Sequence, residues 1–287
     1  MPRIGDLLDA AEERLKASDA VEHPHAGKER YDAEEILGFV LGFPEPLDLD
    51  AVVPARAAHR FDALIERRVG GEPPAYIVGS TEFFGLRLEV RPGAFIPRQS
   101  SEWMAEQAVR RLRRRRDPVH VDMATGLGPV ALAVASRVPW ARVVGVDIST
   151  RAVRLAGANA RRLGLANALF LAGDLFEPLP TDLRGEVGVM TLHPPYVGRR
   201  ELRDLPHEIV RFEPREALTD GSPLGDRILS TVAGTAPEWL RPGGWLLVEV
   251  SPDRARGVGT VLRRAGFREV RSTAGGVKVT RVVVGRR

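Results

Sequence analysis

A histidine, two prolines and a tyrosine occupy residues 193–196, and these residue types could do chemistry if the chain holds them at a ligand site. They follow residues 186–190, a run typical of a buried strand. Because neither proline can donate a backbone N–H to a sheet, the chain must leave the sheet here in a rigid turn. The turn would present an imidazole, backbone carbonyls and an aromatic ring at the carboxyl end of a strand, where open α/β sheets bind ligands.

Three aspartates end three other strand-like runs upstream of this turn. They are Asp122, Asp147 and Asp174, and each lies about one strand-and-helix unit from the next. This spacing places them on one rim of a parallel sheet, together with the Pro-Pro turn. At the second position an acid can accept hydrogen bonds from ribose hydroxyls. At the third position an acid can accept a hydrogen bond from an adenine amino group, while Leu175 or Phe176 covers the adenine ring. The three strand ends together predict a nucleoside site.

A glycine-rich turn, Thr125-Gly126-Leu127-Gly128-Pro129, follows the first of these strands. Its glycines permit a tight turn and a close approach of ligand to backbone, and Pro129 suits the first turn of a helix. The same pattern satisfies a dinucleotide fingerprint. By itself the turn therefore does not distinguish a nicotinamide cofactor from an adenosyl sulfonium.

The helices and strands that must position these residues are expected in three successive segments of the chain. Residues 1–74 show apolar positions at helical spacing, with Asp32 as the expected N-cap of a second helix, and predict a small helical bundle that recognises a substrate or partner. Residues 75–80 and 83–90 alternate like two strands, which predicts a linking β-hairpin over 75–92. Residues 93–287 alternate strand and helix, which is typical of a doubly wound α/β domain.

Strands are expected in this last domain at 119–123, 142–147, 168–172, 186–190, 244–250 and 277–284. The last two should lie at one edge of the sheet, with the final strand antiparallel.

Composition excludes several classes of protein. The 287 residues are 44% hydrophobic and contain no cysteine, which excludes disulfides, thiolate metal sites and a cysteine nucleophile. No apolar run is long enough to span a membrane, and we expect a cytoplasmic enzyme without a metal site. A net charge of +4 is too small to indicate nucleic-acid binding. The arginine-rich residues 110–116 are interpreted as a solvated helix end, with an RNA footprint as the alternative.

Taken together, this layout resembles the class I S-adenosylmethionine-dependent methyltransferases, and more narrowly the release-factor glutamine N5-methyltransferases. The matching segments, in chain order, are 32–37, 71–79, 82–86, 95–98, the Gly126 turn, 194–196 and 213–218. The resemblance implies a Rossmann-like sheet of seven strands, S-adenosyl-L-methionine as cofactor, and a peptide-release factor as partner. The sequence does not indicate an oligomeric state.

The resemblance and the strand ends together assign the site residues. The predicted cofactor-binding residues are Asp122, Thr125, Gly126, Gly128, Asp147, Ile148, Asp174, Leu175 and His193. The predicted catalytic residues are His193, Pro194 and Tyr196, and the predicted substrate contacts are Phe95, Pro97, Arg98 and Tyr196.

Two departures from the family pattern bear on the acceptor. The family has asparagine where this chain has His193; that side-chain carbonyl and the carbonyl of the following proline accept the two N–H groups of the substrate amide. An imidazole offers one acceptor when neutral and none when protonated. The second departure is residues 99–102, Gln-Ser-Ser-Glu where the family has Pro-Glu-Thr-Glu, in a loop that lies over cofactor and substrate in the family.

From these departures we expect a methyltransferase acting on another acceptor, such as a small-molecule metabolite, with displacement or cyclisation as further outcomes. The alternative is a genuine protein-glutamine methyltransferase acting on release factors. His193 would be a general base in the first case, since its ordinary pKa is near 6.5, and a neutral hydrogen-bond acceptor in the second. A nicotinamide-dependent oxidoreductase and a non-catalytic RNA-binding module are the other classes considered.

Overall fold

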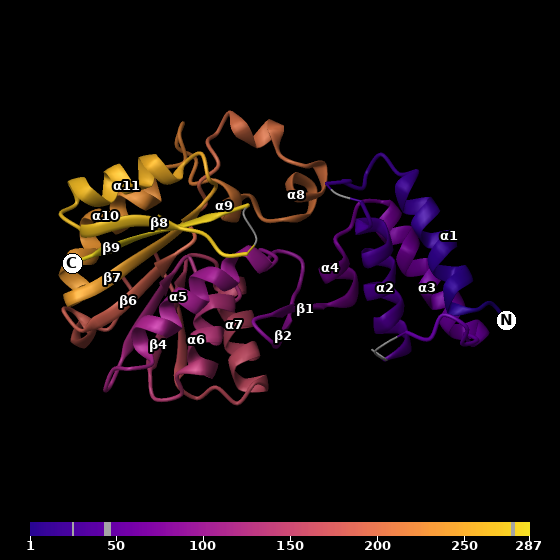
Figure 1. The fold of residues 1–287 in the computed structure, drawn as a ribbon, viewed down its shortest axis with the longest axis horizontal. Helices are drawn as coiled ribbons and strands as arrows, with labels where there is room; N and C mark the ends of the chain where they lie inside the picture. Colours follow the sequence, from indigo (N-terminus) through magenta and orange to yellow (C-terminus); the bar gives the residue numbers. More distant parts are fainter. Residues whose placement is uncertain (25, 43–46, 277–278) are drawn as a thin grey trace. The chain divides into compact units, whose positions relative to one another are not determined.

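The computed structural model describes residues 1–24, 26–42, 47–276 and 279–287. The chain forms two compact units, labelled by element in Figure 1. The first comprises residues 1–81, 90–92 and 204–213, and the second comprises residues 82–89, 93–203 and 214–287. No helix among the described residues is long and apolar enough to cross a membrane.

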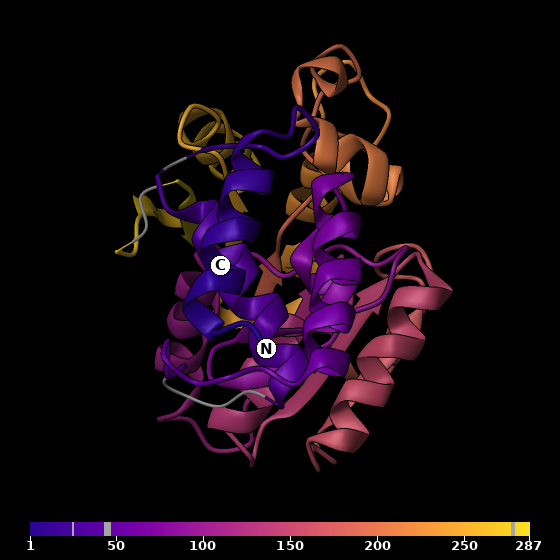
Figure 2. The same cartoon turned by 90° about the vertical axis from the view of Figure 1, so that its right-hand side faces the viewer.

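The first unit is a helical bundle. Its helices are α1 (Ile4–Lys16), α2 (Lys28–Leu41), α3 (Ala55–Val69), α4 (Pro74–Val78) and the short α8 (His207–Phe212). Helices α1, α2 and α3 lie side by side, in indigo to purple in Figure 2. Apolar residues at helical spacing, among them Leu8, Leu15, Ile36 and Ile65, fill one core between them. The helices expected in this region are confirmed.

A buried ionic cluster holds the α8 segment to this bundle. The guanidinium of Arg68 is fully buried, with Nε 2.8 Å from Asp32 Oδ2 and Nη2 2.8 Å from Glu208 Oε1. Lys28 Nζ lies 2.8 Å from the same oxygen of Asp32. The expectation that Asp32 caps a helix is therefore wrong: α2 begins at Lys28, and the Asp32 carboxylate compensates a cation inside the unit.

The expected hairpin is shorter than the sequence indicated. Residues 74–78 form helix α4, and the hairpin is confined to β1 (Ser80–Phe83) and β2 (Leu86–Glu89). The expected first strand is wrong because Ala75, Tyr76, Ile77 and Val78 are all buried, so no polar face alternates with an apolar one. Pro74 lies in the first turn of this helix, where a missing N–H costs nothing. The functional division at residues 74 and 92 stays a prediction.

The second unit contains the seven-stranded sheet. Its strands are β3 (Val119–Met123), β4 (Arg142–Asp147), β5 (Ala168–Ala172), β6 (Val187–Leu192), β7 (Leu240–Val250), β8 (Arg268–Thr273) and β9 (Arg281–Arg286). The order is β5-β4-β3-β6-β7-β9-β8, with β9 antiparallel to both of its neighbours and the other pairs parallel. The doubly wound fold is confirmed.

The strand order at the β8 edge of the sheet differs from the one expected from the sequence. Strand β8 forms this edge, and β9 lies between it and β7, so the expected final pair is not the edge. The expected last strand began at residues 277 and 278, which lie outside the described residues, and β9 itself begins at Arg281. A β8 strand was not recognised because its residues are mostly exposed and polar.

Helices cover both faces of the sheet. Helices α5 (Glu102–Leu112), α6 (Pro129–Arg137) and α7 (Thr150–Arg162) lie on one face, and α10 (Arg227–Trp239) and α11 (Ala255–Arg264) lie on the other (Figure 1). Short helical segments occur at η1 (Gln99–Ser101), η2 (Thr181–Leu183), η3 (Glu201–Asp204) and α9 (Arg215–Leu218). Arg110 and Arg111 lie in the last turn of α5, as the helix-end interpretation of the arginine run predicted.

Candidate active site

The strand order predicts a position where a ligand can bind. Strand β3 pairs with β4 on one side and β6 on the other, and the chain winds outward from β3 in opposite directions. A crevice opens above the carboxyl ends of two such strands because their connections leave to opposite sides. The Gly126 turn follows β3 and the His193 turn follows β6. The two motifs singled out in the sequence therefore flank this crevice.

Asp122 lies below the crevice, and its carboxylate fixes the residues at the base of the crevice by hydrogen bonds. Its Oδ2 accepts a 2.6 Å hydrogen bond from Thr125 Oγ1, and its Oδ1 accepts one of 2.6 Å from Thr191 Oγ1. The ring nitrogen Nε2 of His120 lies 2.9 Å from the same Thr191 oxygen. Burial raises the pKa of Asp122 to about 6. Since the carboxylate is buried and bonded to protein groups, its observed contacts fix Thr125 and β6; direct contact with cofactor stays a prediction.

The two glycines of the turn have different surroundings. Gly128 has a φ of +87°, and a Cβ there would lie 2.8 Å from the Phe170 ring, so packing against β5 requires glycine. Gly126 has a φ of +58°, and a Cβ there would meet no atom within 4 Å. The open space above Gly126 is therefore where the turn can receive a ligand.

Asp147 ends β4 and is fixed by two backbone amides. The N–H of Gly126 donates to Oδ2 at 2.7 Å, and the N–H of Ser149 donates to Oδ1 at 2.8 Å. Burial raises the pKa of Asp147, while these two donors oppose the shift. Next to it, the apolar side chain of Ile148 is 62% exposed. An anchored carboxylate beside an open apolar surface suits a ribose and an adenine ring.

The end of β5 continues the same rim. The N–H of Gly173 donates to the Asp147 carbonyl at 3.0 Å, which ties the ends of β4 and β5 together. Asp174 is exposed, whereas Leu175 is partly buried with a φ of +47°. Phe176 stacks on Trp239 with ring centroids 5.8 Å apart, so it belongs to the core. Leu175 packs against the same core, and which of the two residues covers the ring stays a prediction.

His193 lies in an aromatic cluster made by the residues expected to contact substrate. Its ring meets Phe95 edge-on at 6.0 Å between centroids and stacks on Tyr196 at 5.8 Å. The Arg98 guanidinium lies 4.5 Å from the centre of the Phe95 ring, and Arg254 lies 5.8 Å from that of Tyr196. Pro97 is buried in the same loop as Phe95. Arg254 is a cluster member that the sequence did not indicate.

The backbone of the His193 turn is held by the segment after α9. The Pro195 carbonyl accepts a 3.1 Å bond from the N–H of Asp220, and the N–H of Val197 donates to Leu218 at 3.0 Å. Within the described part of the chain, no N–H bonds to the carbonyl of Pro194. That carbonyl therefore retains its capacity to accept a hydrogen bond from a ligand.

Glu249 is a second charged residue that sequence reasoning missed. It lies on β7 with a side chain that is 0% exposed, and its Oε2 is 4.0 Å from His193 Nδ1. Its other oxygen accepts a 3.2 Å hydrogen bond from Ser100 Oγ. Burial and the Glu249 carboxylate raise the pKa of Tyr196, against the opposing charges of Arg98 and Arg254. A single acid within the apolar run 246–250 was the signal available in the sequence.

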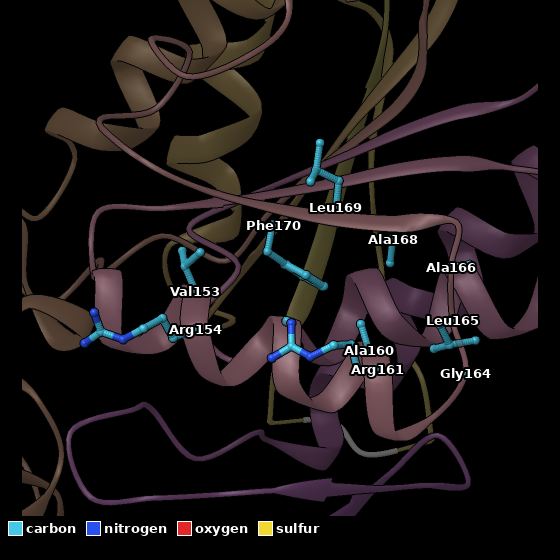
Figure 3. Close-up of a pocket in the computed structure, with 11 residues that line it drawn as sticks. Val153, Arg154, Ala160, Arg161, Gly164, Leu165, Ala166, Ala168, Leu169 and Phe170 are labelled. Carbon is cyan, nitrogen blue, oxygen red and sulfur yellow. The ribbon is translucent and has the colours of Figure 1, made fainter.

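An open cavity of about 680 Å³ lies elsewhere on this unit, between α7 and β5 (Figure 3). Val153, Leu169 and Phe170 line it together with small residues, and Arg154 and Arg161 lie along the α7 side. It contains none of the predicted site residues. Among the described residues, no group of three or more histidine, cysteine, aspartate or glutamate side chains could hold a metal ion.

Comparison with known proteins gives two family matches. Residues 6–79 match the PrmC N-terminal domain, and residues 116–198 match a methyltransferase domain. The release factor glutamine methyltransferase of Bordetella pertussis is 40% identical over 84% of this chain and 87% of its own length. That of Xylella fastidiosa strain 9a5c is 35% identical over 100% of this chain and 98% of its own length.

Solved structures show the same fold. A methyltransferase from Pyrococcus furiosus aligns with a TM-score of 0.53 at 15% identity, covering 71% of this chain and 89% of its own. The 16S rRNA N2 G1207 methyltransferase RsmC of T. thermophilus, in complex with AdoMet and guanosine, aligns with a TM-score of 0.54 at 20% identity. This alignment covers 72% of this chain and 49% of RsmC. At these identities the likeness concerns the fold alone.

Proposed function

The chain belongs to the release factor glutamine methyltransferase family, and we propose that it methylates the side-chain amide nitrogen of a glutamine in a peptide release factor. The family membership identifies an S-adenosylmethionine-dependent methyltransferase. It supports the alternative that we weighed against a small-molecule acceptor, and it gives no support to that acceptor. It also replaces the oxidoreductase and RNA-binding interpretations.

The observation that carries the proposal is the pair of acceptors at the end of β6. A primary amide has two N–H groups, and it is held in one orientation when two acceptors bind them. The carbonyl of Pro194 provides one, and a neutral His193 ring provides the other through Nε2. These bonds leave the nitrogen lone pair directed into the crevice. Fixing the nitrogen in this way lowers the entropic part of the barrier.

The residues around the crevice fit the cofactor. The open space above Gly126, the fixed carboxylate of Asp147 and the exposed Ile148 are suited to a nucleoside. When bound, S-adenosylmethionine supplies an electrophilic methyl group on a sulfonium. Methylation of the amide nitrogen would require that nitrogen to lose a proton. His193 Nε2, which already accepts that N–H, is placed to take it.

The test uses the whole chain, methyl-labelled S-adenosylmethionine and an unmodified peptide release factor. We expect one methyl group on a glutamine side chain, located by peptide mass spectrometry, and no label when that glutamine is replaced by alanine. Asp147→Ala should weaken cofactor binding tenfold or more in calorimetry, because it removes a charged acceptor. Asp182→Ala, which changes an exposed aspartate on η2, is the matched control and should bind normally. Cofactor binding without any label on the release factor would refute the proposed acceptor.

A further inference from the structure

Glu249 is a buried carboxylate with an unused oxygen. Its side chain is 0% exposed, and Oε2 has no hydrogen-bond partner among the described residues. A charged carboxylate buried in this way is costly unless a cation or a donor compensates it. Ser100 supplies one hydrogen bond, to Oε1. The second oxygen is left facing the site.

His193 is the group that can donate a hydrogen bond to the unpaired oxygen of Glu249. The nitrogen that faces the carboxylate is Nδ1, and it lies 4.0 Å from Oε2. A hydrogen bond requires about 2.7–3.2 Å, so ring and carboxylate must approach by about 1 Å. Because Oε2 has no competing hydrogen bond within the described residues, the approach breaks no existing bond there.

The consequence concerns the tautomer of the imidazole. A neutral imidazole has one N–H and one lone pair, and the partner of one nitrogen decides the role of the other. We propose that Glu249 is a positioning residue that accepts the Nδ1–H of His193 and thereby keeps the Nε2 lone pair available to the substrate amide. Without this partner, the ring can place its N–H at Nε2, where it would repel the amide N–H.

Ser100 extends the same arrangement. It lies in the loop 99–102, and His193 lies in the turn after β6. Ser100 and His193 therefore face one carboxylate, Glu249. The Ser100 hydroxyl fixes Oε1, which leaves Oε2 directed at the ring. The loop 99–102 and the His193 turn therefore both lie against this buried acid.

The inference rests on the proposed function, but its first test does not require the substrate. Long-range 1H–15N NMR correlation of the ligand-free protein above pH 8 reports which ring nitrogen of His193 carries the proton. Signals of His193 are identified by their loss in His193→Asn. We expect Nδ1–H in the wild-type chain and a shift toward Nε2–H in Glu249→Leu. Glu102→Gln is the matched control, because its carboxylate bonds the Phe84 N–H and should leave the His193 tautomer unchanged.

The second test is a double-mutant cycle on methyl transfer to the release factor. Glu249→Gln should lower kcat about tenfold or more in the chain with His193, as loss of an orienting partner does elsewhere. In His193→Asn, which has no tautomer to fix, the same change should alter kcat less than about twofold.

Either of two results would overturn the inference. An equal loss of kcat in both backgrounds would mean that Glu249 only supports the fold. A His193 tautomer that is the same in Glu249→Leu and wild type would mean that the carboxylate does not orient the ring. If the tautomer responds to Glu249 while no release factor is methylated, the proposed function fails and the pairing stands.

Discussion

Replacing Asp122 with asparagine should remove a pH dependence of stability that arises from this single buried acid. Burial raises the pKa of Asp122 from 3.8 to about 6. The folded chain therefore binds a proton more tightly than the unfolded chain, and folding stability falls as pH rises through this window. The shift of about two units corresponds to about 3 kcal/mol at neutral pH, since one unit is about 1.4 kcal/mol.

One titratable neighbour, His120, does not obscure this effect. The adjacent His120 is fully buried, and burial lowers its pKa to about 3, so it stays neutral above pH 4. The amide introduced by Asp122→Asn does not titrate, and its altered hydrogen bonds to Thr125 and Thr191 add an offset that does not vary with pH. We therefore expect the stability of this variant, relative to wild type, to increase by about 2.4 kcal/mol between pH 4 and pH 7.5.

Urea unfolding followed by tryptophan fluorescence is the assay. All four tryptophans, Trp103, Trp140, Trp239 and Trp245, belong to the unit that contains Asp122, so the helical unit contributes no signal of this kind. Urea adds no ionic strength, which keeps electrostatic terms comparable at each pH. A difference between the two proteins that stays constant from pH 4 to pH 7.5 would show that burial does not penalise the charged form of Asp122, and the reasoning would be refuted.

Two further predictions concern the turn and the helical unit. Gly128→Ala should destabilise the sheet unit by about 1–3 kcal/mol, because it adds a Cβ against Phe170 in a backbone conformation that disfavours side chains. Gly126→Ala should cost less stability but weaken cofactor binding in calorimetry, and equal unfolding midpoints for the two variants would contradict this. Arg68→Met should cost about 3–5 kcal/mol in the helical unit, because it removes the fully buried cation that pairs with Asp32 and Glu208 and leaves Lys28 to compensate both carboxylates. Hydrogen exchange of the backbone amides of α2 and α3 measures this loss of stability. Unchanged protection would mean that the ion pairs contribute little to the stability of the helical unit.

The sequence alone determined the parts of the fold that depend on local pattern. Strands β3, β4 and β5 were predicted with their bounds, because each is a short, mostly apolar run between turn residues. Their order along the chain then placed Asp122, Asp147 and Asp174 on one rim. The Gly126 turn and the Pro-Pro turn indicated the family together with the five other matching segments of the chain.

Local pattern failed where burial overrode it. Helix α4 was taken for a strand because its residues are buried on every side and show no helical periodicity. Asp32 was taken for a cap because the sequence could not show a buried arginine 36 positions away. Strand β8 was missed because its polar residues lack an apolar run.

The tertiary structure decided which side chains share the site. Sequence reasoning brought Phe95, Arg98, His193 and Tyr196 together only through the family pattern, whereas the structure places their rings and charges in one cluster. It separated Gly126, which faces open space, from Gly128, which packs on Phe170. It also placed Glu249 beside His193, a pairing between β7 and the end of β6. Contacts between neighbouring strands depend on register and burial, and no spacing in the sequence encodes them.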